Sequence, residues 1–128
     1  MENSDQQWID MGVIEELLEM DDGDSGLLTD LIEMFLDDGM QRLEDIQREL
    51  AAGDLDAVMQ AAHRLKGSAG NLGLTPLAHL ADELQIAGRG GDEPKSRELL
   101  ESIGPAFEES GKGLRQLLLT YSGGSRRM

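Results

Sequence analysis

Residues 55–72 read LDAVMQAAHRLKGSAGNL, and the apolar residues of this stretch recur with the period of an α-helix. At about 100° per residue, the apolar positions gather on one side of the helix: Val58, Ala61, Ala62, Leu65, Ala69 and Leu72. This side is predicted to enter a hydrophobic core. His63 lies about 140° from the middle of the apolar stripe, so we expect its imidazole to be at least partly exposed to water.

Helical spacing of apolar residues continues on both sides of this stretch. The further predicted helices cover about residues 10–20, 26–51, 75–88 and 92–119. Their ends follow from capping residues: Ser25 and Asp54 are predicted N-caps, Gly73 is a predicted C-terminal cap, and Thr75-Pro76 is a predicted N-cap followed by proline. Internal glycines weaken the prediction of unbroken helices, at Gly39 in the second and at Gly104-Pro105 and Gly111-Lys-Gly113 in the last.

Short connections between long amphipathic helices favour antiparallel neighbours. The sequence therefore predicts an all-α fold, an antiparallel up-down four-helix bundle with a short extra N-terminal helix that lies across one end as a lid. We expect one domain over residues 10–119, an N-terminal tail over residues 1–9 and a disordered C-terminal tail over residues 120–128. A chain of 128 residues can bury a core of this kind without a metal or disulfide.

Composition excludes several classes of function. The chain has 26 acidic and 11 basic residues and a formal net charge of −15, which argues against nucleic acid and against an anionic membrane surface as partners. It contains no cysteine, so disulfides, thiolate metal sites and a cysteine nucleophile are excluded. The acidic N-terminus does not resemble a signal peptide, and no apolar run reaches the ~18 residues of a membrane span. We therefore expect a soluble, cytoplasmic protein.

The face of the third helix that carries His63 has an unusual composition. Gly67 and Gly70 lie on the same side, and Lys66 lies one turn beyond the histidine. Each glycine inside a helix costs roughly 0.5–1 kcal/mol relative to alanine, and a solvated face gains nothing from it. We infer that a partner approaches the backbone closely here. The expected docking residues are Met59, Gln60, Arg64, Gly67 and Gly70.

Imidazole is nucleophilic while neutral near physiological pH, and a lysine three residues on can place positive charge beside the oxygens of a phosphoryl group. The predicted position of His63 is not enclosed, so we expect the partner to supply the rest of the active site. His79 is interpreted as an ordinary exposed histidine. A metal site built from His63 and His79 lacks ligand spacing such as H-x-x-x-H, so none is predicted.

The segment His63-Arg-Leu-Lys66-Gly67-Ser68-Ala69-Gly70-Asn71-Leu72-Gly73 closely resembles the signature of histidine-containing phosphotransfer (HPt) domains, roughly H-x-L-K-G-S-S-x-x-x-G. The likeness extends to Phe35-Leu36-Asp37, to Gly53-Asp54 and to residues 77–84. It spans about residues 10–119, although only residues 63–73 are specific to the family. The departure is Ala69, which replaces a second serine and falls on the predicted core face.

The resemblance implies a role for each matching residue. His63 would accept a phosphoryl group on a ring nitrogen, and Lys66 would assist electrostatically. Gly67 would allow a receiver domain to approach, and Ser68 would orient the imidazole or bind phosphate. Gln85 lies where some members place a polar residue that hydrogen-bonds the acceptor histidine.

The resemblance also implies a relay. The protein would take a phosphoryl group from an aspartate on the receiver domain of a hybrid histidine kinase or response regulator and pass it to another receiver. The Mg²⁺ for this chemistry would lie on the receiver, so no cofactor is expected on this chain. Gly111-Lys112 lacks the other residues of a nucleotide-binding loop, with Ala106 and Gly113 at their positions, so a carrier that binds no ATP is expected rather than a kinase.

One alternative remains, a helical binding module that docks and sequesters a receiver domain without accepting phosphate. Replacement of His63 by glutamine separates the two, because it should abolish transfer but leave sequestration intact. A single acceptor histidine on one bundle favours a monomer. The initial methionine and the short tail after the bundle favour a stand-alone protein over a domain excised from a kinase.

Overall fold

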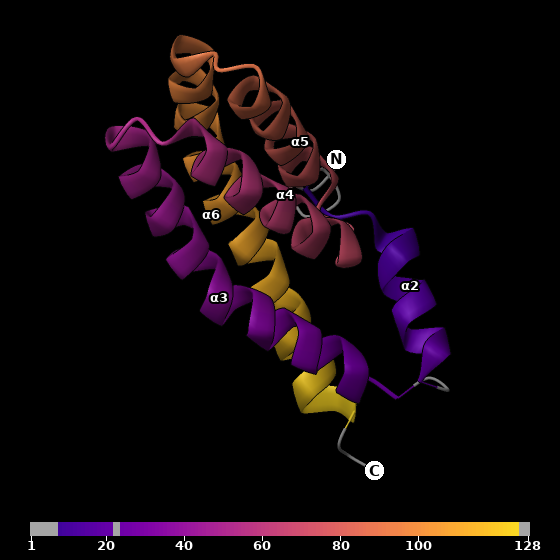
Figure 1. Ribbon diagram of the computed structural model, residues 1–128. Helices are drawn as coiled ribbons and strands as arrows, with labels where there is room; N and C mark the ends of the chain where they lie inside the picture. Colours follow the sequence, from indigo (N-terminus) through magenta and orange to yellow (C-terminus); the bar gives the residue numbers. More distant parts are fainter. Residues whose placement is uncertain (1–7, 22–23, 126–128) are drawn as a thin grey trace, which may run out of the picture.

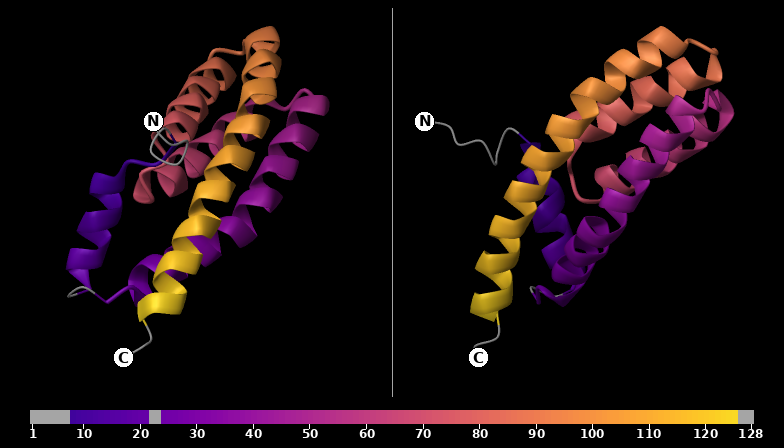
Figure 2. Two further views of the ribbon diagram at one scale, coloured as in Figure 1. Left: turned by 180° about the vertical axis from the view of Figure 1, so that it is seen from behind. Right: turned by 90° about the vertical axis from the view of Figure 1, so that its left-hand side faces the viewer.

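The computed structural model describes residues 8–21 and 24–125 of the chain (Figure 1). Its helices are α2 (Met11–Met20), α3 (Gly26–Ala51), α4 (Leu55–Asn71), α5 (Thr75–Arg89) and α6 (Glu93–Ser125). No strand occurs among the described residues. Helices α3 to α6 run alternately up and down in one bundle, and α2 is the short extra helix at its N-terminal side (Figures 1 and 2). The predicted fold class is confirmed.

The connections between the bundle helices are short and follow local backbone chemistry. Glycines with positive φ angles lie in the turns after α3, α4 and α5, at Gly53, Gly73 and Gly91. The side chain of Asp54 accepts a hydrogen bond from the Ala57 N–H at 3.1 Å, as expected for an N-cap.

Two predicted caps act differently in the structure. Leu74 is the N-cap of α5, and Thr75 lies inside the helix with its hydroxyl donating to the Gly73 carbonyl. Ser25 occupies the N-cap position of α3 but makes no side-chain cap bond. Its hydroxyl donates instead to the Tyr121 carbonyl at 3.3 Å, and the carboxylates of Asp21 and Asp24 accept the first N–H groups of α3.

The core lies between the four bundle helices, and the two longest helices pack against each other through aromatic rings. The centroids of Phe35 on α3 and Phe107 on α6 are 5.6 Å apart. A Cβ placed on Gly39 would lie 2.5 Å from the Phe107 ring, so the glycine admits the ring rather than breaking the helix. Helix α3 continues through this position, because tertiary packing outweighs the low helix propensity of one glycine.

Helix α2 packs beside α3 and against the turn between α4 and α5. The Asp10 N–H donates to the Gly73 carbonyl at 2.7 Å, and Ile9 is buried in the core. The expected lid therefore covers the end of the α4–α5 hairpin. Ile9 was assigned to the predicted N-terminal tail of residues 1–9, but it packs with the bundle. Residues 1–7 of that predicted tail lie outside the described residues.

Helix α6 is helical without interruption from Glu93 to Ser125, across Pro105 and the later glycines. Buried side chains hold it against its neighbours on both sides of Pro105, among them Ile103, Phe107 and Leu114. The predicted disordered tail over residues 120–128 is corrected for residues 120–125, which extend the helix. The Ser25 hydroxyl donates to the Tyr121 carbonyl near this end, and residues 126–128 lie outside the described part.

Candidate functional site

Helix α4 presents His63 to solvent because its opposite side is buried. The predicted core face is confirmed: Val58, Ala61, Ala62, Leu65 and Ala69 are all at most 3% exposed. His63 is exposed, as are Gln60, Lys66, Gly67 and Gly70 on the outward side of the helix. The helical wheel therefore predicted the orientation of the histidine correctly.

Helices α4 and α5 lie antiparallel in a register that brings specific residues together. Their backbones approach closely at Gly88, where an added Cβ would lie 3.1 Å from the Leu55 carbonyl oxygen and 3.2 Å from the Met59 nitrogen. One turn along α4, His63 and Gln85 line the same hollow. One turn further, Lys66 meets Asp82.

The hollow beside His63 is an open depression of about 390 Å³. It is lined from α4 and α5 by Met59, Gln60, His63, Arg64, Gln85 and Arg89. Two arginines thus line the same hollow as His63 in a strongly acidic protein. An anion that reaches the hollow would meet these charges first.

Gln85, which lines this hollow, carries a buried acceptor. Its Oε1 atom is buried and has no hydrogen-bond partner among the described residues. An unpaired buried carbonyl oxygen favours a nearby N–H donor, because desolvation without a partner costs about 1–3 kcal/mol. The ring N–H of His63 is a donor of this kind, although no hydrogen bond joins the two side chains in the structure. The predicted contact between Gln85 and His63 therefore remains a prediction.

Gly67 and Gly70 form a bare strip of helix next to the histidine. A Cβ added at either position would have no atom within 4 Å outside the local backbone. This contrasts with Gly39 and Gly88, whose missing side chains admit a neighbouring ring or backbone. The protein's own packing therefore gives no reason for glycine at 67 and 70.

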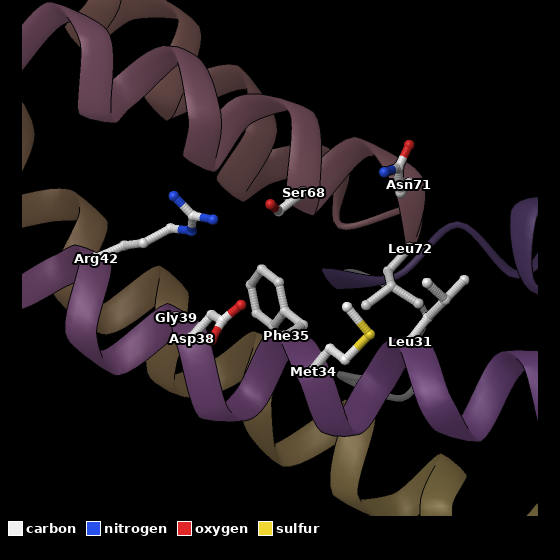
Figure 3. A pocket seen from close by; sticks show the side chains of 9 residues that line it. All are labelled: Leu31, Met34, Phe35, Asp38, Gly39, Arg42, Ser68, Asn71 and Leu72. Carbon is white, nitrogen blue, oxygen red and sulfur yellow. The ribbon is translucent and has the colours of Figure 1, made fainter.

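Ser68 lies on the other flank of α4, away from the hollow of His63. It lines a groove of about 170 Å³ between α3 and α4 (Figure 3). The other lining residues are Leu31, Met34, Phe35, Asp38, Gly39, Arg42, Asn71 and Leu72. The structure thus does not bring Ser68 to the imidazole, and Figure 3 shows Arg42 extending from α3 toward Ser68 instead.

Lys66 is also outside the hollow of His63. Its Nζ lies 2.9 Å from Oδ1 of Asp82 on α5, and both side chains are partly exposed. The sequence predicted Lys66 at the site but missed Asp82. The sequence could have indicated this pair, because the turn at Gly73 sets the antiparallel register of α4 and α5 and thereby places Asp82 opposite Lys66.

Two carboxylates near the end of α3, those of Asp45 and Glu49, are influenced by the positive charge of Arg64. A hydrogen bond from Arg48 lowers the pKa of Asp45, with a smaller contribution from Gln41 and from the charge of Arg64. Burial raises the pKa of Glu49, and the negative charge of Asp45 adds to this rise. Arg64 therefore lines the His63 hollow and also acts by its charge on these two carboxylates.

The second histidine is placed as expected. His79 is exposed and lies 3.2 Å from a Glu83 carboxylate oxygen, one turn along α5. Among the described residues, no group of three or more histidine and acidic side chains is arranged to hold a metal ion. None of the described helices is both long and apolar enough to cross a membrane.

Comparisons with known proteins found similar sequences and a similar fold. The phosphorelay intermediate protein YPD1 of Candida albicans is 31% identical over 84 residues, which are 66% of this chain and 46% of that protein. Multistep phosphorelay regulator 1 of Schizosaccharomyces pombe is 34% identical over 85 residues, again 66% of this chain but 29% of that protein. The chain thus spans half or less of the length of these two relatives.

A solved structure covers more of the fold. Histidine-containing phosphotransfer protein B of Pseudomonas aeruginosa PAO1 is similar with a TM-score of 0.81 and 29% sequence identity, over 89% of this chain and 96% of that one. The family model of the Hpt domain matches residues 30–121, which include all of α4 and α5 and the His63 hollow. The chain belongs to the Hpt domain family.

Proposed function

We propose that this chain is a phosphorelay intermediate of two-component signalling, in which His63 accepts a phosphoryl group from a receiver-domain aspartate and passes it to another receiver. The supporting observation is the exposed imidazole, which lies between two features that the packing of the chain does not explain. One is the bare strip of Gly67 and Gly70, and the other is the hollow bordered by Arg64 and Arg89.

The transfer step needs no group beyond the two proteins and the ion on the receiver. The lone pair of the unprotonated ring nitrogen attacks phosphorus, and an N–P bond forms as the P–O bond to the aspartyl oxygen breaks. The electron pair of the broken bond leaves with the aspartate carboxylate. The other ring nitrogen keeps its proton and later exchanges it with water. The same sequence in reverse delivers the phosphoryl group to the next receiver.

Local charge favours the phosphorylated state in spite of the net charge of −15. Arg64 and Arg89 line the hollow of the histidine and can neutralise part of the dianion. Gln85 would accept a hydrogen bond from the free ring N–H through its buried Oε1 atom, which would fix the tautomer that presents the nucleophilic nitrogen.

The receiver would dock across Gly67 and Gly70, with Met59 and Gln60 at one side of the contact. The groove between α3 and α4 continues this surface past Ser68, so Ser68 would contact the partner rather than the phosphoryl group. Met34 at the edge of the groove is 59% exposed and offers an apolar contact. The proposal includes a monomeric, cytoplasmic carrier that binds no ATP and takes its Mg²⁺ chemistry from the receiver.

Transfer of labelled phosphate from a panel of phosphorylated receiver domains tests the proposal. We expect acid-labile label on the wild type and none on His63→Gln. His79→Gln is the matched control, because it removes the other exposed histidine and should accept label at the wild-type rate. If one receiver binds tightly but no receiver transfers label, the protein is instead a sequestering module.

A further inference from the structure

The lysine of the family motif is already engaged in the unphosphorylated protein. Lys66 Nζ lies 2.9 Å from Asp82 Oδ1, across the contact of α4 and α5. Lys66 does not line the hollow of His63, whereas Arg64 and Arg89 do. Before transfer, the lysine charge is therefore directed to α5 and away from the place where the phosphoryl group would bind.

The register of the two helices fixes this arrangement. His63 and Lys66 are one turn apart on α4, so their side chains leave the helix as neighbours, with about 5–6 Å between Cβ atoms. Gln85 and Asp82 are one turn apart on α5 and face them in the opposite order. Asp82 therefore lies one turn from the hollow, which it does not line, and it pairs with Lys66.

A phosphoryl group on His63 would compete with Asp82 for the same ammonium group. It brings close to two negative charges and three acceptor oxygens to a position one helical turn from Lys66. Lys66 is 46% exposed and its stem is flexible, so Nζ can turn from one anion to the other. To bind the Lys66 ammonium group, the phosphoryl group must therefore displace Asp82 from it.

We propose that Asp82 is a positioning residue that holds Lys66 away from His63 and thereby lowers the stability of the phosphorylated state. The inference rests on the proposed role of His63. Its consequence is a carrier that releases its phosphoryl group to the next receiver more readily than the free lysine would allow. No atom of Asp82 takes part in bond making or breaking.

The equilibrium of label between a receiver and this chain measures the effect. Exposed ion pairs of this kind change an equilibrium by about 1.5-fold to fivefold. We therefore expect Asp82→Asn to shift the equilibrium toward phosphorylated His63 by that factor, and Lys66→Gln to shift it the other way. Asp82→Glu keeps the charge and should restore the wild-type value. Glu83→Gln removes the same charge from the neighbouring position, outside the Lys66 pair, and should leave the equilibrium unchanged.

The double variant Asp82→Asn/Lys66→Gln separates the ion pair from a general effect of charge. We expect it to match Lys66→Gln alone, because Asp82 acts only through the lysine. An equal gain from Asp82→Asn with and without Lys66 would overturn the inference, as would no gain or a loss. Circular dichroism confirms that each variant is folded. If the wild type takes no label from any receiver, the proposed function itself fails, whereas a labelled wild type with an unresponsive Asp82→Asn removes only this inference.

Discussion

Replacement of Gly67 by alanine should stabilise the fold and slow phosphoryl transfer at the same time. A Cβ at this position has no neighbour within 4 Å, so the folded state accepts the methyl group without strain. Alanine in a helix interior is more favourable than glycine by about 0.5–1 kcal/mol. For a domain of this size, that gain corresponds to a rise of roughly 2–5 °C in Tm.

The same methyl group would stand between α4 and a docked receiver. A misplacement of about 1 Å between reacting groups can reduce a rate about a hundredfold, so we expect the transfer rate of Gly67→Ala to fall at least about tenfold. Gly70→Ala should act in the same directions. The opposite effects on stability and on transfer rate follow from one cause, namely that the space over Gly67 is empty in this chain and would be occupied by the partner.

Thermal unfolding and single-turnover transfer from a labelled receiver measure the two effects. Gly88→Ala is the matched control for stability, because its Cβ would lie 3.1 Å from the Leu55 carbonyl oxygen, and it should lower Tm. A Gly67→Ala protein that transfers at the wild-type rate would refute the docking argument. A Gly67→Ala protein with a Tm below that of the wild type would refute the inference that the folded state accepts the methyl group without strain.

Further predictions concern the fold. Gly39→Ala should destabilise the bundle by about 1–3 kcal/mol in urea unfolding, because its Cβ would overlap the Phe107 ring, and an unchanged midpoint would contradict this packing. Asp54→Ala should cost about 1 kcal/mol through loss of the α4 N-cap, while Asp54→Ser should retain most of the stability. Burial raises the pKa of Glu49 above its ordinary 4.5, so the carboxyl destabilises the folded state as pH rises through that range. Glu49→Gln should therefore raise the urea midpoint at pH 7 and lose this gain toward pH 4, whereas an equal gain at both pH values would exclude the titration as its cause.

The sequence predicted the bundle well because apolar periodicity and the capping residues of α4 agree with each other. It also predicted which side of α4 is exposed, since Leu65 and Ala69 leave His63 only the solvent side. Helix ends were less predictable where a distant contact decides them. The last turns of α6 lie beside the start of α3, where the Ser25 hydroxyl donates to the Tyr121 carbonyl, and these two residues are 96 positions apart in the chain.

Glycines were the main source of error, because a sequence does not show what lies over each one. Gly39 weakened the prediction of α3, although it admits the Phe107 ring into a continuous helix. Gly88 falls at the predicted end of α5, which ends at Arg89 in the structure, and its backbone also lies directly against Leu55 and Met59 of α4. The placement of Ser68 in the groove beside α3 and the pairing of Lys66 with Asp82 likewise follow from neighbours on other helices.

The proposed role of His63 is tested most directly by locating the phosphoryl group itself. The wild type should be phosphorylated by a receiver domain, kept at neutral or alkaline pH, and analysed by ³¹P NMR and by mass spectrometry of its peptides. We expect a phosphorus–nitrogen signal and a phosphorylated peptide whose fragments assign the group to His63. Phosphate on His79 or on a serine or aspartate, or a receiver that binds this chain and leaves it unmodified, would contradict the central claim.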